Sequence, residues 1–277
     1  MKRMSAEQAA EIIQHDDMVA FSGFTPAGSP KALPTAIAQR ACERHQDGQP
    51  FQIRLLTGAS IGAAADDALS AADAVSWRAP YQTSSGLREK INQGQVRFVD
   101  LHLSEVAQMV NYGFFGDIDV AVIEASAIAP DGRIWLSSGI GNAPTWLLRA
   151  KKVIIELNHY HNPRVAEFAD IEIPGAPPRR NSVPIFHTMD RVGSQCVQID
   201  PRKVVAVVDT ELPDAGNASD KTNPVSQQIA DNVVTFLLAE MAHKRIPAEF
   251  LPLQSGVGNI NNEVMASLGE HPDIPPV

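Results

Sequence analysis

Three glycine-containing segments are the places where this chain could bind an anion. Residues 23–28 and 137–142 each follow an apolar run typical of a strand, and residues 255–260 precede a stretch typical of a helix. Glycine lets backbone N–H groups approach a ligand closely, and a helix N-terminus favours negative charge. Taken singly, each segment is more often a tight turn. If they converge at one sheet edge, we expect a cleft of backbone donors suited to an oxyanion or a thioester carbonyl.

The last of these segments contains the sharpest motif, Gly256-Val257-Gly258-Asn259-Ile260. It lacks the Lys-Ser/Thr pair of a phosphate-binding P-loop, and it is not a complete G-x-G-x-x-G fingerprint. Nucleotide-phosphate and dinucleotide binding are therefore not predicted.

Titratable residues near predicted strands give weaker signals. His159 and His161 are spaced to share one strand face, but no carboxylate or cysteine lies nearby in a recognised metal spacing, so we predict structural or surface histidines and no metal site. Glu124 is predicted to be a buried, hydrogen-bonded acid because an unpaired buried charge is costly. Arg179 and Arg180 either contact an anionic group or form a solvated basic turn.

The elements that must position these residues follow from the apolar pattern. Runs of valine, isoleucine and alanine without strict alternation predict strands covered on both faces. Helices are expected between them, so the fold class is α/β, a mostly parallel sheet with helices on both faces. The expected strands are 18–22, 52–56, 119–123, 152–157 and 204–208, and the expected helices are 6–15, 30–44, 144–149 and 225–243.

One antiparallel element is predicted within this pattern. The sequence Ala-Pro-Asp-Gly at residues 129–132 is a strong turn signal between the apolar runs 120–126 and 133–136. We therefore expect a hairpin there.

Composition narrows the function classes. The chain has 277 residues, 44% of them hydrophobic and 20% charged, with a net charge of -9. This balance is typical of a globular protein and argues against nucleic acid as a partner. Cys42 and Cys196 are expected to be reduced, and no segment predicts a membrane span or a signal peptide. The expected location is the cytoplasm.

A polar segment rich in Gly, Asn, Asp and Pro indicates a domain boundary. We predict a first domain at residues 1–211, a linker at 212–224 and the start of a second domain at 225–277. About fifty residues are too few for an independent core, so the second domain is expected to be truncated.

Several long passages resemble the acetyl-CoA hydrolase/transferase family of class I coenzyme A-transferases. The resemblance runs over essentially the whole chain. It is carried by residues 22–38 (SGFTPAGSPKALPTAIA), 76–94, 100–147 and 252–262 (PLQSGVGNINN).

The resemblance implies two similar α/β domains that move CoA from an acyl-CoA, such as propionyl-CoA, to a small carboxylate, such as succinate, through a glutamyl-CoA thioester. It implies CoA contacts for Gly256, Val257, Gly258, Asn259 and Ile260. It also assigns Gln82 and Thr83 to a carboxylate pocket. Coenzyme A is then a substrate, no separate cofactor is expected, and a homo-oligomer is implied.

The resemblance places the family's nucleophilic glutamate just beyond Val277, so no catalytic residue is expected in this chain. Acetyl-CoA hydrolysis and an acetate-using transferase are the nearest alternatives. A CoA-binding remnant without turnover is the non-enzymatic alternative, and a sugar-phosphate isomerase-like enzyme is a weaker one.

Overall fold

The structure is a computed structural model that describes all residues except 176, 216–222, 248–252, 257 and 275–277. The chain divides into two compact units, Met1–Pro184 with Arg191–Ala215, and Ile185–Asp190 with Gly216–Val277. The domain boundaries predicted from the sequence are retained as a proposal.

The first unit is built on a mostly parallel sheet. Strands β4, β3, β2, β1, β5, β7 and β9 are neighbours in that order and run parallel, while β6 pairs antiparallel with β5 and β8 antiparallel with β6. The predicted fold class and the hairpin are therefore confirmed. The strands are β1 (Met18–Phe21), β2 (Ile53–Leu56), β3 (Val75–Ala79), β4 (Arg97–Phe98), β5 (Ile118–Ile128), β6 (Arg133–Leu136), β7 (Ala150–Asn158), β8 (Val197–Gln198) and β9 (Val204–Thr210).

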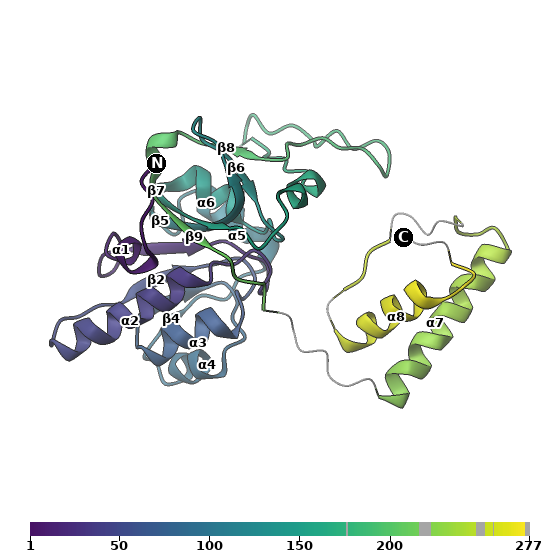
Figure 1. Cartoon of the computed structure of the whole chain (residues 1–277), viewed down its shortest axis with the longest axis horizontal. Coiled ribbons are helices and arrows are strands. Elements are labelled where there is room, and N and C mark those ends of the chain that lie inside the picture. Colours follow the sequence, from purple (N-terminus) through teal and green to yellow (C-terminus); the bar gives the residue numbers. More distant parts are fainter. Residues whose placement is uncertain (176, 216–222, 248–252, 257, 275–277) are drawn as a thin grey trace. The chain divides into compact units, whose positions relative to one another are not determined.

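Helices cover both faces of this sheet (Figure 1). Along β1, Val19 and Phe21 belong to the core under α1 to α4, whereas Met18 and Ala20 belong to the core under α5 and α6. This alternation explains why the strand reads as a continuous apolar run. The helices are α1 (Ala6–Ala10), α2 (Ala32–Gln46), α3 (Ala63–Ala71), α4 (Ser85–Asn92), α5 (Leu103–Asn111) and α6 (Ala143–Arg149), with short 3-10 helices η1 (Pro163–Phe168) and η2 (Pro201–Lys203).

The predicted boundaries of the first two helices were wrong. Ser5 caps α1, which ends at Ala10 and not at residue 15. Arg40 binds the carbonyl oxygens of Ala10 and Ile13, just beyond this end. The next helix begins at Ala32 and not at Pro30, because its first turn is capped from a distant strand.

The second unit contains α7 (Pro224–Ala242) and α8 (Asn259–Glu270), which pack through Val234 and Leu268. Asn223 caps α7, so the predicted helix at 225–243 is confirmed within one residue. The apolar run Phe-Leu-Pro-Leu at residues 250–253 also suggests a short strand, but residues 250–252 lie outside the described part. Among the described residues, the helices are too short or too polar to cross a membrane.

Candidate functional site

Two of the predicted glycine segments meet at the carboxyl edge of the sheet. Gly28 has a φ of +67°, and a Cβ placed there would lie 2.7 Å from the backbone nitrogen of Gly139. A Cβ at Gly139 would lie 2.3 Å from the carbonyl oxygen of Ala27. The two loops, 23–28 and 137–142 (the edge loops below), therefore touch backbone to backbone, at a distance that only glycine permits.

A further loop after β2 joins them, and sequence reasoning missed its role. A Cβ at Gly58 would lie 3.5 Å from the carbonyl oxygen of Gly23, and one at Gly62 would lie 3.4 Å from Pro26. Parallel strands end at the same sheet edge, which is where ligands bind in such folds. The predicted segment 255–260 belongs to the second unit.

The second edge loop offers backbone donors. Within the described residues, the amides of Gly139, Ile140 and Gly141 have no hydrogen-bond acceptor. Gly141 has a φ of +47° and directly precedes Asn142, the N-cap of α6. Such amides could stabilise a developing oxyanion.

A buried charged cluster lies beneath the edge loops. Glu124 on β5 is 1% exposed and accepts hydrogen bonds from Ser137 Oγ at 2.5 Å and Asn158 Nδ2 at 3.0 Å. Its own amide donates to Ser22 Oγ at 2.9 Å, and Ser22 donates to the Gly28 carbonyl at 2.8 Å. Glu124 is thus the hydrogen-bonded acid that the sequence suggested, and it connects both edge loops to the sheet.

Lys31 balances this charge. Its Nζ contacts Glu124 Oε2 and lies 2.9 Å from Asp214 Oδ1. Burial would lower the pKa of Lys31, but the hydrogen bonds and charges of Glu124 and Asp214 outweigh it and raise that pKa. Lys31 therefore stays cationic at neutral pH.

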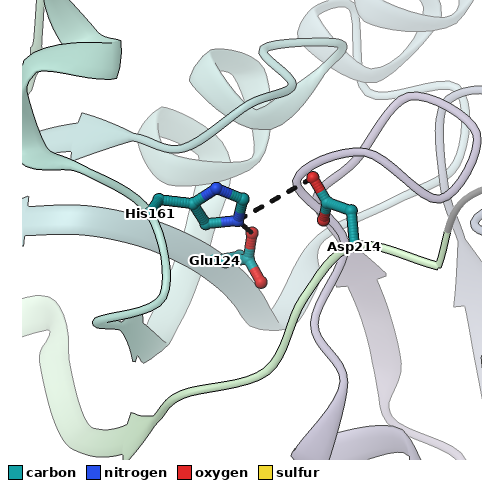
Figure 2. Close-up of side chains that lie close together, drawn as sticks. All are labelled: Glu124, His161 and Asp214. Atoms are coloured by element: carbon teal, nitrogen blue, oxygen red, sulfur yellow. Dashed lines mark ion pairs between the residues drawn. The ribbon is translucent and has the colours of Figure 1, made fainter.

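His161 completes the cluster, as Figure 2 shows. Its Nε2 is buried without a hydrogen bond to the described residues, 3.4 Å from Glu124 Oε1 and 3.8 Å from Asp214 Oδ2. No carboxylate lies near His161 in a recognised metal spacing of the sequence, but the fold brings two carboxylates to it. By type and proximity the three side chains could hold a metal ion. We assign none, because Lys31 already supplies a positive charge to both carboxylates.

A second buried glutamate caps α2. Glu156 on β7 accepts backbone hydrogen bonds from Lys31 at 2.7 Å and from Ala32 and Leu33 at 3.1 Å. Burial raises the pKa of Glu156, and neighbouring Glu124 adds to this. A side chain from a strand thereby caps the first turn of α2.

The predicted carboxylate-pocket residues follow β3. Thr83 is exposed, and its Oγ1 lies 2.8 Å from Ser60 Oγ. Gln82 is 9% exposed, and its Oε1 has no hydrogen-bond partner among the described residues. Ser60 in turn donates to Asp66 at 3.0 Å, and Asp66 faces the fully buried Arg78 at 3.4 Å. A hydroxyl pair, and a buried amide oxygen without a partner among the described residues, thus follow the ends of β2 and β3.

The predicted CoA-contact residues lie at the start of α8. Gly258 is the N-cap, with a φ of +146°, and Asn259 and Ile260 open the helix. Gly256 is exposed, and Val257 lies outside the described residues.

The fold and its edge loops define an α/β protein with a candidate ligand site at the carboxyl edge of its sheet. Residues 1–209 match the model of the acetyl-CoA hydrolase/transferase N-terminal domain. The chain belongs to this family.

Curated relatives agree with this assignment. The chain is 84% identical to propanoyl-CoA:succinate CoA transferase of Escherichia coli K12, over 99% of the chain and 56% of that protein. It is 39% identical to succinyl-CoA:acetate CoA-transferase of Clostridium kluyveri, over 97% of the chain and 49% of that protein. Acetyl-CoA hydrolase of Eremothecium gossypii is 36% identical, over 95% of the chain and 51% of that protein. The chain spans about half the length of these relatives.

Solved structures support the fold. RipA from Yersinia pestis aligns with a TM-score of 0.65 at 20% identity, covering 99% of this chain and 55% of that one. Glutaconate coenzyme A-transferase from Acidaminococcus fermentans aligns with a TM-score of 0.53 at 15% identity, covering 98% of this chain and 93% of that one.

Proposed function

We propose that the complete protein containing this chain is a CoA-transferase that moves CoA from propionyl-CoA to succinate. The observation that supports this proposal most directly is the 84% identity, over 99% of the chain, to the protein named propanoyl-CoA:succinate CoA transferase. The test is to incubate the complete protein with both substrates and to measure succinyl-CoA and propionate. Hydrolysis to propionate and free CoA without succinyl-CoA would instead favour the hydrolase alternative.

We assign distinct tasks to the parts of this chain. The amides of residues 139–141, which have no acceptor among the described residues, stabilise the oxyanion that forms when the thioester carbonyl is attacked. The start of α8, with Gly256, Val257, Gly258, Asn259 and Ile260, binds CoA through backbone donors and the helix N-terminus. The attacking carboxylate, a glutamate in the proposed reaction, is assigned to no residue of this chain.

The carboxylate substrate is assigned to Gln82 and Thr83, with Ser60 beside them. In support, the hydroxyls of Thr83 and Ser60 are held 2.8 Å apart beside Gln82, and hydroxyl groups can donate to a carboxylate. We expect Thr83→Val to raise the KM for succinate about tenfold, because a hydrogen bond to a charged group is lost. The KM for propionyl-CoA should stay within about twofold on the same reasoning. Thr35→Val on the exposed face of α2 is the control, and an equal rise in both KM values would remove this assignment.

We also propose a cytoplasmic homo-oligomer for the complete protein. The free state of Cys42 and Cys196 is compatible with a reducing compartment. Light scattering of the purified complete protein tests the assembly, and a monomeric mass would contradict it.

A further inference from the structure

The segment that leaves β9 is tied to both edge loops by one side chain. Asp214 Oδ1 accepts a hydrogen bond from the Gly28 amide at 3.3 Å and pairs with Lys31 Nζ at 2.9 Å. Its other oxygen accepts the hydroxyl of Ser138. One carboxylate thus contacts the first edge loop, the second edge loop and the residue that precedes α2.

A second tie fixes the same segment two residues earlier. The amide of Leu212 donates to Asn158 Oδ1 at 3.1 Å, and Asn158 Nδ2 donates back to the Leu212 carbonyl at 2.7 Å. Asn158 is fully buried and also donates to Glu124. The segment is therefore held by its backbone at Leu212 and by its side chain at Asp214.

The charges make this attachment more than a surface ion pair. The side chains of Lys31 and Asp214 are 13% and 23% exposed, and Glu124 is fully buried beside them. Removing one charge from such a group leaves the others uncompensated in a poorly solvated place. Burial raises the pKa of Asp214, but hydrogen bonds from Ser138 and Lys31 outweigh it and leave that pKa below its ordinary value.

We propose that Lys31 and Asp214 are positioning residues, a clasp that holds the two edge loops against each other and fixes where the chain leaves the first unit. The catalytic part of this inference rests on the proposed transferase function. Without the clasp, the Gly28 amide and the Ser138 hydroxyl lose their shared acceptor. The free amides of residues 139–141 then lose their fixed direction, and small misplacements of such groups reduce turnover steeply.

The experiment compares Asp214→Asn with Asp209→Asn in the complete protein. Asp209 is the matched control. It is an acid near the end of β9, but it pairs with Arg3 and His159 and not with the edge loops. Hydrogen exchange of peptides covering residues 22–31 and 137–143 is the first readout. We expect about tenfold faster exchange in both peptides for Asp214→Asn, equivalent to about 1.4 kcal/mol of local opening, and no change for the control.

Steady-state kinetics is the second readout. We expect kcat to fall about tenfold in Asp214→Asn with KM values within about twofold, since the clasp acts on the loop amides and not on substrate binding. Asp214→Glu, which keeps the charge, should recover most of the turnover.

The outcomes separate the clasp from the proposed function. Unchanged exchange in Asp214→Asn overturns the clasp, whatever the activity. Faster exchange with unchanged kcat overturns its positioning role. A wild-type protein without CoA exchange overturns the proposed transferase, while the exchange comparison still decides whether the clasp exists.

Discussion

Replacing Glu156 by alanine should lower the free energy of unfolding by about 3–5 kcal/mol. Glu156 is fully buried and accepts hydrogen bonds from the amides of Lys31, Ala32 and Leu33. Truncation leaves these amides without acceptors at a buried helix start and creates a cavity beneath them. Urea denaturation followed by circular dichroism measures the loss.

The control for this prediction is Asp200→Ala. Asp200 also caps a helix start, η2, but at the surface, where water can replace it, so its loss should destabilise the protein much less. A Glu156→Ala loss no larger than this would mean that the first turn of α2 finds other acceptors, and that the strand does not cap the helix.

The same glutamate gives a pH dependence with a defined sign. Burial raises the pKa of Glu156 in the folded state above its ordinary value of 4.5. The folded state therefore binds this proton more tightly than the unfolded state, so the associated stability is present below pH 4.5 and is lost as pH rises through the folded pKa. The difference in unfolding free energy between wild type and Glu156→Gln should accordingly shift against wild type as pH rises from 4.5. A difference that is constant with pH would contradict the raised pKa.

The sheet could be predicted from the sequence because its signals are local. Strand β1 is an unbroken apolar run, β5 and β7 contain the apolar runs 120–123 and 153–155, and the turn at 129–132 predicted the hairpin. The first residues of the helices were harder to predict than the strands. The residue that caps α2 lies 123 positions from Leu33, and the register that places Glu156 there pairs it with Glu124 on β5. No local pattern encodes that register.

The candidate site also has a part that could be predicted from the sequence and a part that could not. The edge loops were visible because glycine next to a strand end is a local signal. Their supporting charges were not, since Lys31 and Asp214 are far apart in sequence and each is ordinary in its own context. His161 was assigned a structural or surface role for lack of a nearby carboxylate, and two carboxylates reach it only through the fold. Ser60 reaches Thr83 only because β2 pairs with β3, and no local pattern in the sequence encodes that pairing.

Replacing Gly28 by alanine should cost about 3–4 kcal/mol of stability, and Gly94→Ala separates the two causes. Both glycines have similar positive φ angles, +67° and +73°. A Cβ at Gly94 has nothing within 4 Å, whereas one at Gly28 would meet the backbone nitrogen, oxygen and Cα of Gly139 at 2.7–2.9 Å. The left-handed backbone alone costs about 1–2 kcal/mol, so the remaining ~2 kcal/mol measures the contact between the edge loops.

In the complete protein, Gly28→Ala should also reduce kcat about 100-fold, because pushing the loops apart displaces the amides assigned to the oxyanion. Gly94→Ala, which follows α4 in open space, should leave kcat unchanged. Equal losses of stability in the two variants would mean that the edge loops separate freely. Loops that separate freely cannot hold backbone donors in a fixed direction, and the proposed oxyanion role of residues 139–141 would then lose its structural basis.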